Sequence, residues 1–181
     1  MKMKTLVQIV MLGSLGLVAA SGCAVAQKVS AEARLKELNI ILPPERIPGP
    51  GAHFINTARV GNLLFLAGTN TGADYPLRGK VGKDLTVEQG YQAARFIGIQ
   101  TLSKIRAAIG SLDRVKRVVK VLGMVVASDD FTQFAAVING FSDLYVDVFG
   151  EAIGKHPRSA IGIAGVATHF PVEIEVIVEV E

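Results

Sequence analysis

Ten residues near the C-terminus of this chain, 172–181, alternate between apolar and mostly acidic side chains. Glutamate occupies four of the five positions on one side of the extended chain, and the other side is entirely aliphatic. A period of two over this length predicts a β-strand with one face on a hydrophobic core. The fold must therefore contain a sheet that is covered on one face. The aliphatic positions are Val172, Ile174, Val176, Val178 and Val180.

A second alternating segment, residues 158–164, precedes this strand. Arg158, Ala160 and Gly162 fall on one side of it, and two isoleucines fall on the other. If the two segments pair as a hairpin, Arg158 and Glu173 border one cleft with a floor of small side chains. The pattern leaves a structural alternative open. In that case Arg158 is a solvated charge at a strand start, and the glutamates protect an edge strand from aggregation.

The N-terminus has the features of an export signal. Two lysines in the first four residues precede an apolar run, residues 6–20, and Ala24-Val25-Ala26 matches a small-x-small cleavage site. We therefore expect a signal peptide (1–26), an N-terminal extension with a proline-rich linker (27–50) and one domain (51–181). The expected location is the periplasm or the exterior of the cell.

Cys23, the only cysteine, offers a second route for the same segment. The sequence Ala20-Ser21-Gly22-Cys23 is similar to a bacterial lipoprotein box, in which Cys23 becomes lipidated and anchors the protein to a membrane. Cleavage after Ala26 is the favoured route, and only the lipidated form is expected to have a membrane partner. Loss of residues 1–26 leaves 17 of the 19 basic residues against 16 acidic ones. Because there is no basic run with interleaved aromatic residues, we expect no nucleic-acid partner.

Two long helices are predicted from apolar spacing and end signals. The first spans Thr86 to Ile109, with Thr86 as its N-cap and a glycine as its stop. The second spans residues 131–149 and follows a Ser-Asp-Asp run that we expect to cap it. A short helix is expected at residues 30–38.

Strand signals cover residues 54–60, 63–67 and 117–127. The second of these is apolar enough to be buried on both faces. The glycine-rich segment 68–84 lacks the Gly-Lys-Ser/Thr frame of a phosphate loop and is predicted to be a flexible surface loop.

The resulting order is ββαβαββ, which predicts an α+β fold of two layers, with two helices on one face of a mixed sheet. No segment remains to cover the other face. We expect oligomerisation to cover it, because sheets from several subunits can pack together with clefts between them.

Four segments resemble the RidA/YjgF family over roughly residues 51–181. They are residues 60–68, the second helix with Asn139, Pro157-Arg158-Ser159-Ala160 and residues 171–175. The resemblance implies a chorismate-mutase-like fold and a homotrimer with active sites between subunits. It also implies hydrolysis of reactive enamines or imines to 2-keto acids and ammonia. The long 68–84 loop and the proline-rich extension are more similar to a divergent branch that is often labelled endoribonuclease.

The resemblance also assigns roles to residues by position. Arg158 matches the arginine that holds the substrate carboxylate, for which a planar guanidinium is suited because it can donate two parallel hydrogen bonds. Glu173 matches the glutamate near the attacking water. Further positions that are expected to contact the substrate are Phe54, Thr69, Asn139 and Ala160.

Three functions remain open at this point. The first is an exported enamine or imine deaminase, and the second is a non-catalytic module that binds small carboxylates or proteins. The third is an endoribonuclease, against which the absence of a basic surface run and of a histidine acid-base pair both count. The three histidines lack metal-ligand spacing, so neither a metal nor a cofactor is expected.

Overall fold

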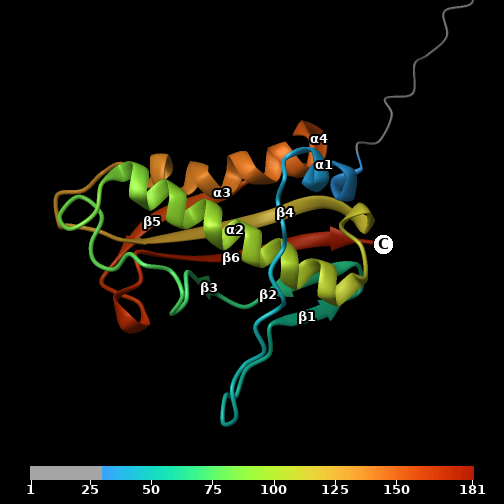
Figure 1. The fold of residues 1–181 in the computed structure, drawn as a ribbon, viewed down its shortest axis with the longest axis horizontal. Coiled ribbons are helices and arrows are strands. Elements are labelled where there is room, and N and C mark those ends of the chain that lie inside the picture. The colour runs from blue at the N-terminus through green and yellow to red at the C-terminus, as the bar shows by residue number, and fades with distance from the viewer. Residues whose placement is uncertain (1–29) are drawn as a thin grey trace, which may run out of the picture.

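The structure is a computed structural model that describes residues 30–181 (Figure 1). The predicted signal peptide and Cys23 lie outside the described residues. A six-stranded mixed sheet forms one layer and two long helices form the other, so the predicted α+β architecture is confirmed. The strands are β1 (Thr57–Val60), β2 (Leu63–Leu66), β3 (Thr69–Asn70), β4 (Val115–Val126), β5 (Arg158–Ile163) and β6 (Val172–Val180).

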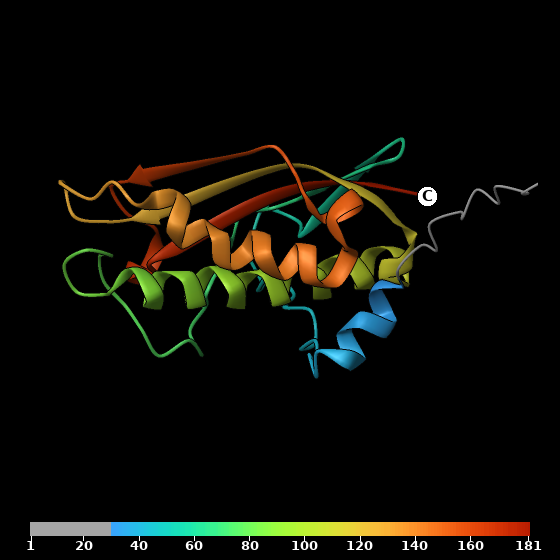
Figure 2. The ribbon, with the colours of Figure 1, turned by 90° about the horizontal axis from the view of Figure 1, so that it is seen from above.

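The two long helices are α2 (Val87–Ile109) and α3 (Phe134–Phe149), which lie side by side over one face of the sheet (Figures 1 and 2). Thr86 caps α2 as predicted, in a reciprocal capping box with Gln89. The helices approach closely at Gly140, where an added Cβ would lie 2.0 Å from a backbone carbonyl oxygen of α2. This close approach explains why glycine stands in the middle of a helix.

The predicted start of the second helix is wrong. α3 begins at Phe134 and its N-cap residue, Gln133, makes no side-chain capping bond. The Ser-Asp-Asp run forms a turn instead, in which the N–H of Phe131 donates to the carbonyl of Ser128 over 3.1 Å. Phe131 is buried and packs edge-to-face on Phe134, which holds this segment in the turn.

The predicted terminal hairpin is also wrong. The strand order is β1-β2-β6-β4-β5, with β3 pairing with β6, so β4 lies between β5 and β6. β5 runs parallel to β4, and α3 is the connection between them. Parallel neighbours need such a crossover, and the β4–α3–β5 segment supplies it. The alternation of side chains in β5 and β6 thus predicted that both are strands, but it did not predict that β4 lies between them.

The faces of the last two strands differ from the prediction as well. The aliphatic side of β6 is buried against the helices, and its glutamates face away, as expected. The small side of β5, however, points toward α3: a Cβ on Gly162 would lie 2.7 Å from the ring of Phe134, and Ala160 packs on the core. Arg158 therefore lies on the helix side of the sheet and Glu173 on the opposite side. The small residues make room for α3 and do not form the floor of a shared cleft.

The face of the sheet opposite the helices is left uncovered by the described residues (Figure 2). Its exposed apolar side chains include Val60 on β1, Phe65 on β2 and Ile161 on β5, with 67%, 38% and 43% of their surface accessible. The exposure of Phe65 shows that β2 is not buried on both faces, contrary to the prediction. β2 is covered only on the helix side, where Leu64 and Leu66 are buried.

The N-terminal part of the described chain packs on the outside of the helix layer. The short helix expected at residues 30–38 is present as α1 (Ala31–Glu37), which is capped by Ser30 and contacts α3. The next segment, residues 40–49, crosses α2 and is called the strap here (Figure 1). The hydroxyl of Ser103 on α2 donates to the carbonyl of Pro43 over 2.5 Å, which fixes the strap to the helix.

The glycine-rich segment 68–84 is not simply a surface loop, contrary to the prediction. It contains β3, and Thr71 and Val81 in it are completely buried. Three short helical elements complete the fold: α4 (Glu151–Gly154), and the 3-10 turns η1 (Leu112–Arg114) and η2 (Ala167–His169). Within residues 30–181, no helix is both long and apolar enough to cross a membrane.

Candidate functional site

Arg158, at the start of β5, is held against α3 by neutral acceptors. Its Nη1 donates to the Ser142 hydroxyl over 2.7 Å, and its Nη2 donates to Asn139 Oδ1 over 2.6 Å and to the carbonyl of Ala135 over 3.3 Å. No carboxylate within residues 30–181 forms an ion pair with it. Three of the five N–H donors of the guanidinium are used and two remain. The charge is therefore fixed in position and available to an anionic ligand.

His156 extends this arrangement by one more residue. Its Nδ1 lies 2.6 Å from the carbonyl of Gly154, and its Nε2 lies 3.1 Å from the Ser142 hydroxyl. Because a carbonyl can only accept, Nδ1 carries the proton, and in the neutral imidazole Nε2 accepts from Ser142. The hydroxyl of Ser142 then accepts from Arg158. The three side chains form one directed chain of hydrogen bonds.

The environment of His156 favours the neutral imidazole that this chain requires. Burial lowers the pKa of His156, and the nearby charge of Arg158 lowers it further, although the hydrogen bond to the Gly154 carbonyl acts in the opposite sense. Sequence reasoning missed both His156 and Ser142 as parts of the site. The available signals were the spacing of Ser142 three residues after Asn139, on the same helix face, and the place of His156 two residues before Arg158.

Glu173 on β6 lies in a second location, next to Gly68. A Cβ on Gly68 would lie 2.3 Å from the Oε1 of Glu173, so the carboxylate rests directly on the glycine backbone. Asn70 of β3 is its strand neighbour. No cation within the described part of the chain forms an ion pair with Glu173. A carboxylate in this position is free to accept hydrogen bonds from water.

Phe54 and Thr69 border a small cavity beside Gly68, with a volume of about 170 Å³. Phe54 lies before the start of β1 and is exposed. Thr69 is buried, donates its hydroxyl hydrogen to the carbonyl of Ala67 over 3.1 Å and accepts from Lys104 on α2 over 2.9 Å. Lys104 is the third residue that sequence reasoning missed, because its spacing on α2 does not distinguish it from solvent-facing lysines.

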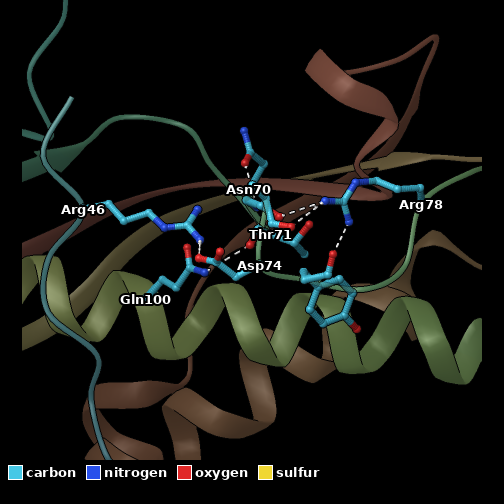
Figure 3. Close-up of polar contacts among 9 residues, drawn as sticks. Arg46, Asn70, Thr71, Asp74, Arg78 and Gln100 are labelled. Atoms are coloured by element: carbon cyan, nitrogen blue, oxygen red, sulfur yellow. Dashed lines mark hydrogen bonds and ion pairs between the residues drawn. The ribbon is translucent and has the colours of Figure 1, made fainter. Parts of the chain in front are cut away.

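Polar contacts around residues 70–78 fix the rim of this region (Figure 3). Arg46 of the strap pairs with Asp74 over 2.7 Å. Gln100 of α2 donates to the carbonyl of Thr71 over 3.2 Å. The guanidinium of Arg78 donates to four carbonyl groups of its own segment and lies 4.4 Å from the centre of the Phe170 ring. These hydrogen bonds and the ion pair hold the rim in a fixed position.

The predicted site residues therefore form two groups in one chain. The arginine group comprises Arg158, Asn139, Ser142 and His156, and the glutamate group comprises Glu173 with Phe54, Gly68 and Thr69. Glu173 on β6 and Arg158 on β5 are separated by β4, two strand spacings or about 10 Å across the sheet, and the two charges lie on opposite faces of the sheet. Ala160 belongs to neither group, because its side chain packs on the core. One copy of the chain does not bring Arg158 and Glu173 together.

Residues 30–181 contain no group of three or more His, Cys, Asp or Glu side chains that could hold a metal ion.

Comparison with known proteins gives consistent matches. Residues 56–168 match a sequence family described as "YjgF/chorismate_mutase-like, putative endoribonuclease". Protein TCP17 of Trypanosoma cruzi is 39% identical over 149 residues, which cover 81% of this chain and 92% of that protein.

Two solved structures are similar over most of their length. Protein Atu1372 of Agrobacterium tumefaciens, whose function is unknown, has a TM-score of 0.74 and 34% identity, covering 83% of this chain and 92% of that one. A protein of Shewanella oneidensis MR-1 described as a "putative endoribonuclease" has a TM-score of 0.77 and 23% identity. That match covers 84% of this chain and 100% of the Shewanella chain, and at this identity it shows the shared fold.

Proposed function

This chain belongs to the YjgF/chorismate-mutase-like family, also known as RidA/YjgF, and on that premise we propose that it binds small carboxylate-bearing imines or enamines and hydrolyses them to 2-keto acids and ammonia. The observation that supports this proposal most strongly is the Arg158 guanidinium, which is fixed by neutral acceptors and has no carboxylate partner within the described residues. A cation that is already oriented loses little freedom when it binds a carboxylate.

The proposed site lies between subunits of a homotrimer. The arginine group of one copy faces the glutamate group of its neighbour. Two copies thus bring together the groups that lie apart in a single chain. The uncovered sheet face, with its exposed apolar residues Val60, Phe65 and Ile161, is the surface that association would bury. The expected result in multi-angle light scattering is a trimer, and a stable monomer at micromolar concentration would contradict the intersubunit site.

The proposed chemistry uses three groups. Arg158 and Asn139 hold the substrate carboxylate, so that the C=N carbon lies close to the bound water. Glu173 of the neighbouring copy accepts a proton from that water as its oxygen attacks the carbon. The resulting carbinolamine receives a proton on nitrogen and collapses, with cleavage of the C–N bond and release of ammonia and a 2-keto acid. Phe54 packs on the substrate but has no hydroxyl to donate.

The test compares Arg158→Ala and Arg158→Lys with the wild-type protein. Loss of the guanidinium contact should cost about 2–4 kcal/mol of binding free energy, a roughly 30- to 1,000-fold loss of affinity for 2-ketobutyrate in calorimetry. Lysine should restore little, because a point charge cannot reproduce the planar donor group. Arg34→Ala is the matched control, since Arg34 lies on α1, away from the sheet, and pairs with Glu37. Equal affinity of Arg158→Ala and wild type would remove the basis of the proposal.

Ammonia release from an enamine generated in the assay separates catalysis from binding. Release by the wild type, with loss in Arg158→Ala and Glu173→Gln, supports the deaminase. Binding of keto acids without ammonia release would instead indicate a non-catalytic carboxylate-binding module. The family description also carries an endoribonuclease label, and cleavage of a model RNA by the purified protein would favour that activity.

Export of the chain is part of the same proposal. Mass spectrometry of the native N-terminus distinguishes the two routes: a start at Gln27 indicates a soluble exported protein, and a lipidated Cys23 indicates an anchored one. An intact Met1 would contradict both.

A further inference from the structure

The strap and α2 enclose a cavity that the proposed deaminase site does not use. Its volume is about 450 Å³, and its lining is mostly apolar. The apolar lining residues are Ile41, Pro43, Pro44, Phe96 and Ile99. Arg46, Asp74, Gln100 and Lys104 are the polar residues that complete the wall. A cavity of this size and lining suits a small ligand with a hydrocarbon part.

Lys104 is unusual because it lies at the boundary of two cavities. It lines both the strap cavity and the smaller cavity beside Gly68, yet only 8% of its surface is accessible to solvent. Within residues 30–181 it makes no ion pair. Burial of a charged lysine without a carboxylate partner is energetically unfavourable. A purely structural role therefore does not explain why a lysine occupies this position.

The hydrogen bonds of the Lys104 amine leave its lone pair available. Thr69 is the one partner that the described residues give this amine, over 2.9 Å. The single hydroxyl hydrogen of Thr69 is already donated to the carbonyl of Ala67, so the hydroxyl accepts an N–H of Lys104. A neutral Lys104 therefore uses a hydrogen in this contact and keeps its nucleophilic electron pair unshared.

The charge environment supports the neutral form. Burial is the largest influence on the pKa of Lys104 and lowers it; the charge of Glu45 raises it, that of Arg46 lowers it and that of Glu173 raises it, and the net direction is downward. A lysine with the ordinary pKa of about 10.4 is neutral in only about 1 of 2,500 molecules at pH 7, so any lowering increases the reactive fraction. Lysines that are desolvated in this way act as nucleophiles toward carbonyl groups.

We propose that Lys104 is a carbonyl-reactive amine that captures small apolar aldehydes from the strap cavity as a Schiff base. The amine nitrogen attacks the carbonyl carbon to give a carbinolamine, and loss of one water molecule, which carries off the carbonyl oxygen and both amine hydrogens, leaves the C=N bond. The hydrocarbon chain of the aldehyde lies along Phe96 and Ile99. This reaction needs neither Arg158 nor the intersubunit cleft.

The strap is held closely enough to define this cavity. Besides the bond from Ser103 to Pro43, the amide of Asn56 donates to the carboxylate of Glu45 over 2.7 Å and to the carbonyl of Arg46 over 2.6 Å. The pair between Arg46 and Asp74 fixes the other side (Figure 3). The cavity therefore has a defined wall, and selectivity for short apolar chains follows from its size.

The test is reductive trapping with hexanal and cyanoborohydride at pH 7, followed by peptide mapping. Lys36 on α1 is exposed and serves as the internal reference. Labelling of Lys104 should exceed that of Lys36 roughly tenfold or more at limiting hexanal. Lys104→Arg should lose this fast label, Lys36→Arg should retain it, and Ile99→Phe, which fills the cavity, should slow it. Because the readout on wild-type protein is a mass at one residue, it does not depend on ammonia release.

Labelling of Lys104 no faster than that of Lys36 would overturn the proposal. If Lys104→Arg then retains calorimetric binding of hexanoate, the cavity would be assigned to carboxylates instead. Lys104→Met, checked for folding by circular dichroism, provides a second variant that must also lose the label if the amine is the nucleophile.

Discussion

Replacement of Ser142 by alanine tests whether the directed chain of hydrogen bonds prepares Arg158 for its ligand. The hydroxyl accepts from the guanidinium over 2.7 Å and lies 3.1 Å from the Nε2 of His156. A hydrogen bond to a charged group contributes about 1.5–3 kcal/mol and a neutral one about 1 kcal/mol. Because the site is half-buried, water can replace part of both contacts. We expect the free energy of unfolding to fall by about 1–2 kcal/mol.

The same substitution should weaken ligand binding, but less than loss of the arginine itself. Arg158 keeps its bonds to Asn139 and to the Ala135 carbonyl, so its charge remains while its orientation loosens. A cost of about 1 kcal/mol corresponds to a roughly fivefold rise in the Kd for 2-ketobutyrate. Urea denaturation followed by circular dichroism measures the first effect, and calorimetry measures the second.

The matched control is Ser111→Ala. Ser111 is the N-cap of η1, where its hydroxyl accepts from the N–H of Asp113 over 3.2 Å. Loss of this cap should lower the free energy of unfolding by about 1 kcal/mol but leave the affinity for 2-ketobutyrate unchanged. If Ser142→Ala binds the keto acid as tightly as Ser111→Ala does, the hydroxyl does not orient Arg158, and the proposed preorganisation is refuted.

Three further changes have defined outcomes. Gly68→Ala should displace the carboxylate of Glu173, because the new Cβ would lie 2.3 Å from its Oε1. Ammonia release should then fall at least tenfold. The melting temperature should change little, because the flexible side chain of Glu173 can move away. Gly140→Ala should lower the melting temperature by roughly 5 °C or more in calorimetry, because its Cβ would lie 2.0 Å from the rigid carbonyl oxygen of Tyr91. Burial holds the pKa of His156 below its usual value, so the unfolded chain binds more protons below about pH 6.5. Stability in urea titrations should therefore fall as the pH drops from about 6.5 through the lower pKa of the folded protein, and His156→Gln should flatten this dependence.

The local structure of this chain follows closely from its sequence. The ten alternating residues that include β6 predicted a strand with one buried face, and Thr86 and Gly110 marked both ends of α2. These features depend on neighbours within a few positions. The fold class followed from the order of such elements, because an alternation of helices with strands leaves few two-layer arrangements.

Long-range features did not follow from the sequence. Alternation specifies which residues share a face of one strand, but it does not specify which strands are neighbours, so the insertion of β4 between β5 and β6 was missed. The face on which Arg158 lies depends on α3, whose close packing needs the small residues Ala160 and Gly162. His156, Ser142 and Lys104 acquire their chemistry from burial and from partners far along the chain, which periodicity does not reveal.

The position of β6 has a consequence for synthesis of the chain. β6 follows the other five strands of the sheet in the chain and leaves the ribosome after them, yet it is the strand to which β2, β3 and β4 all bind. Until residues 172–180 emerge, the β1–β2 pair and the β4–β5 pair each present an unpaired edge, and unpaired edges are sites of aggregation. The sheet of a nascent chain must therefore remain incomplete until β6 appears. The two halves of the sheet then join in one late step.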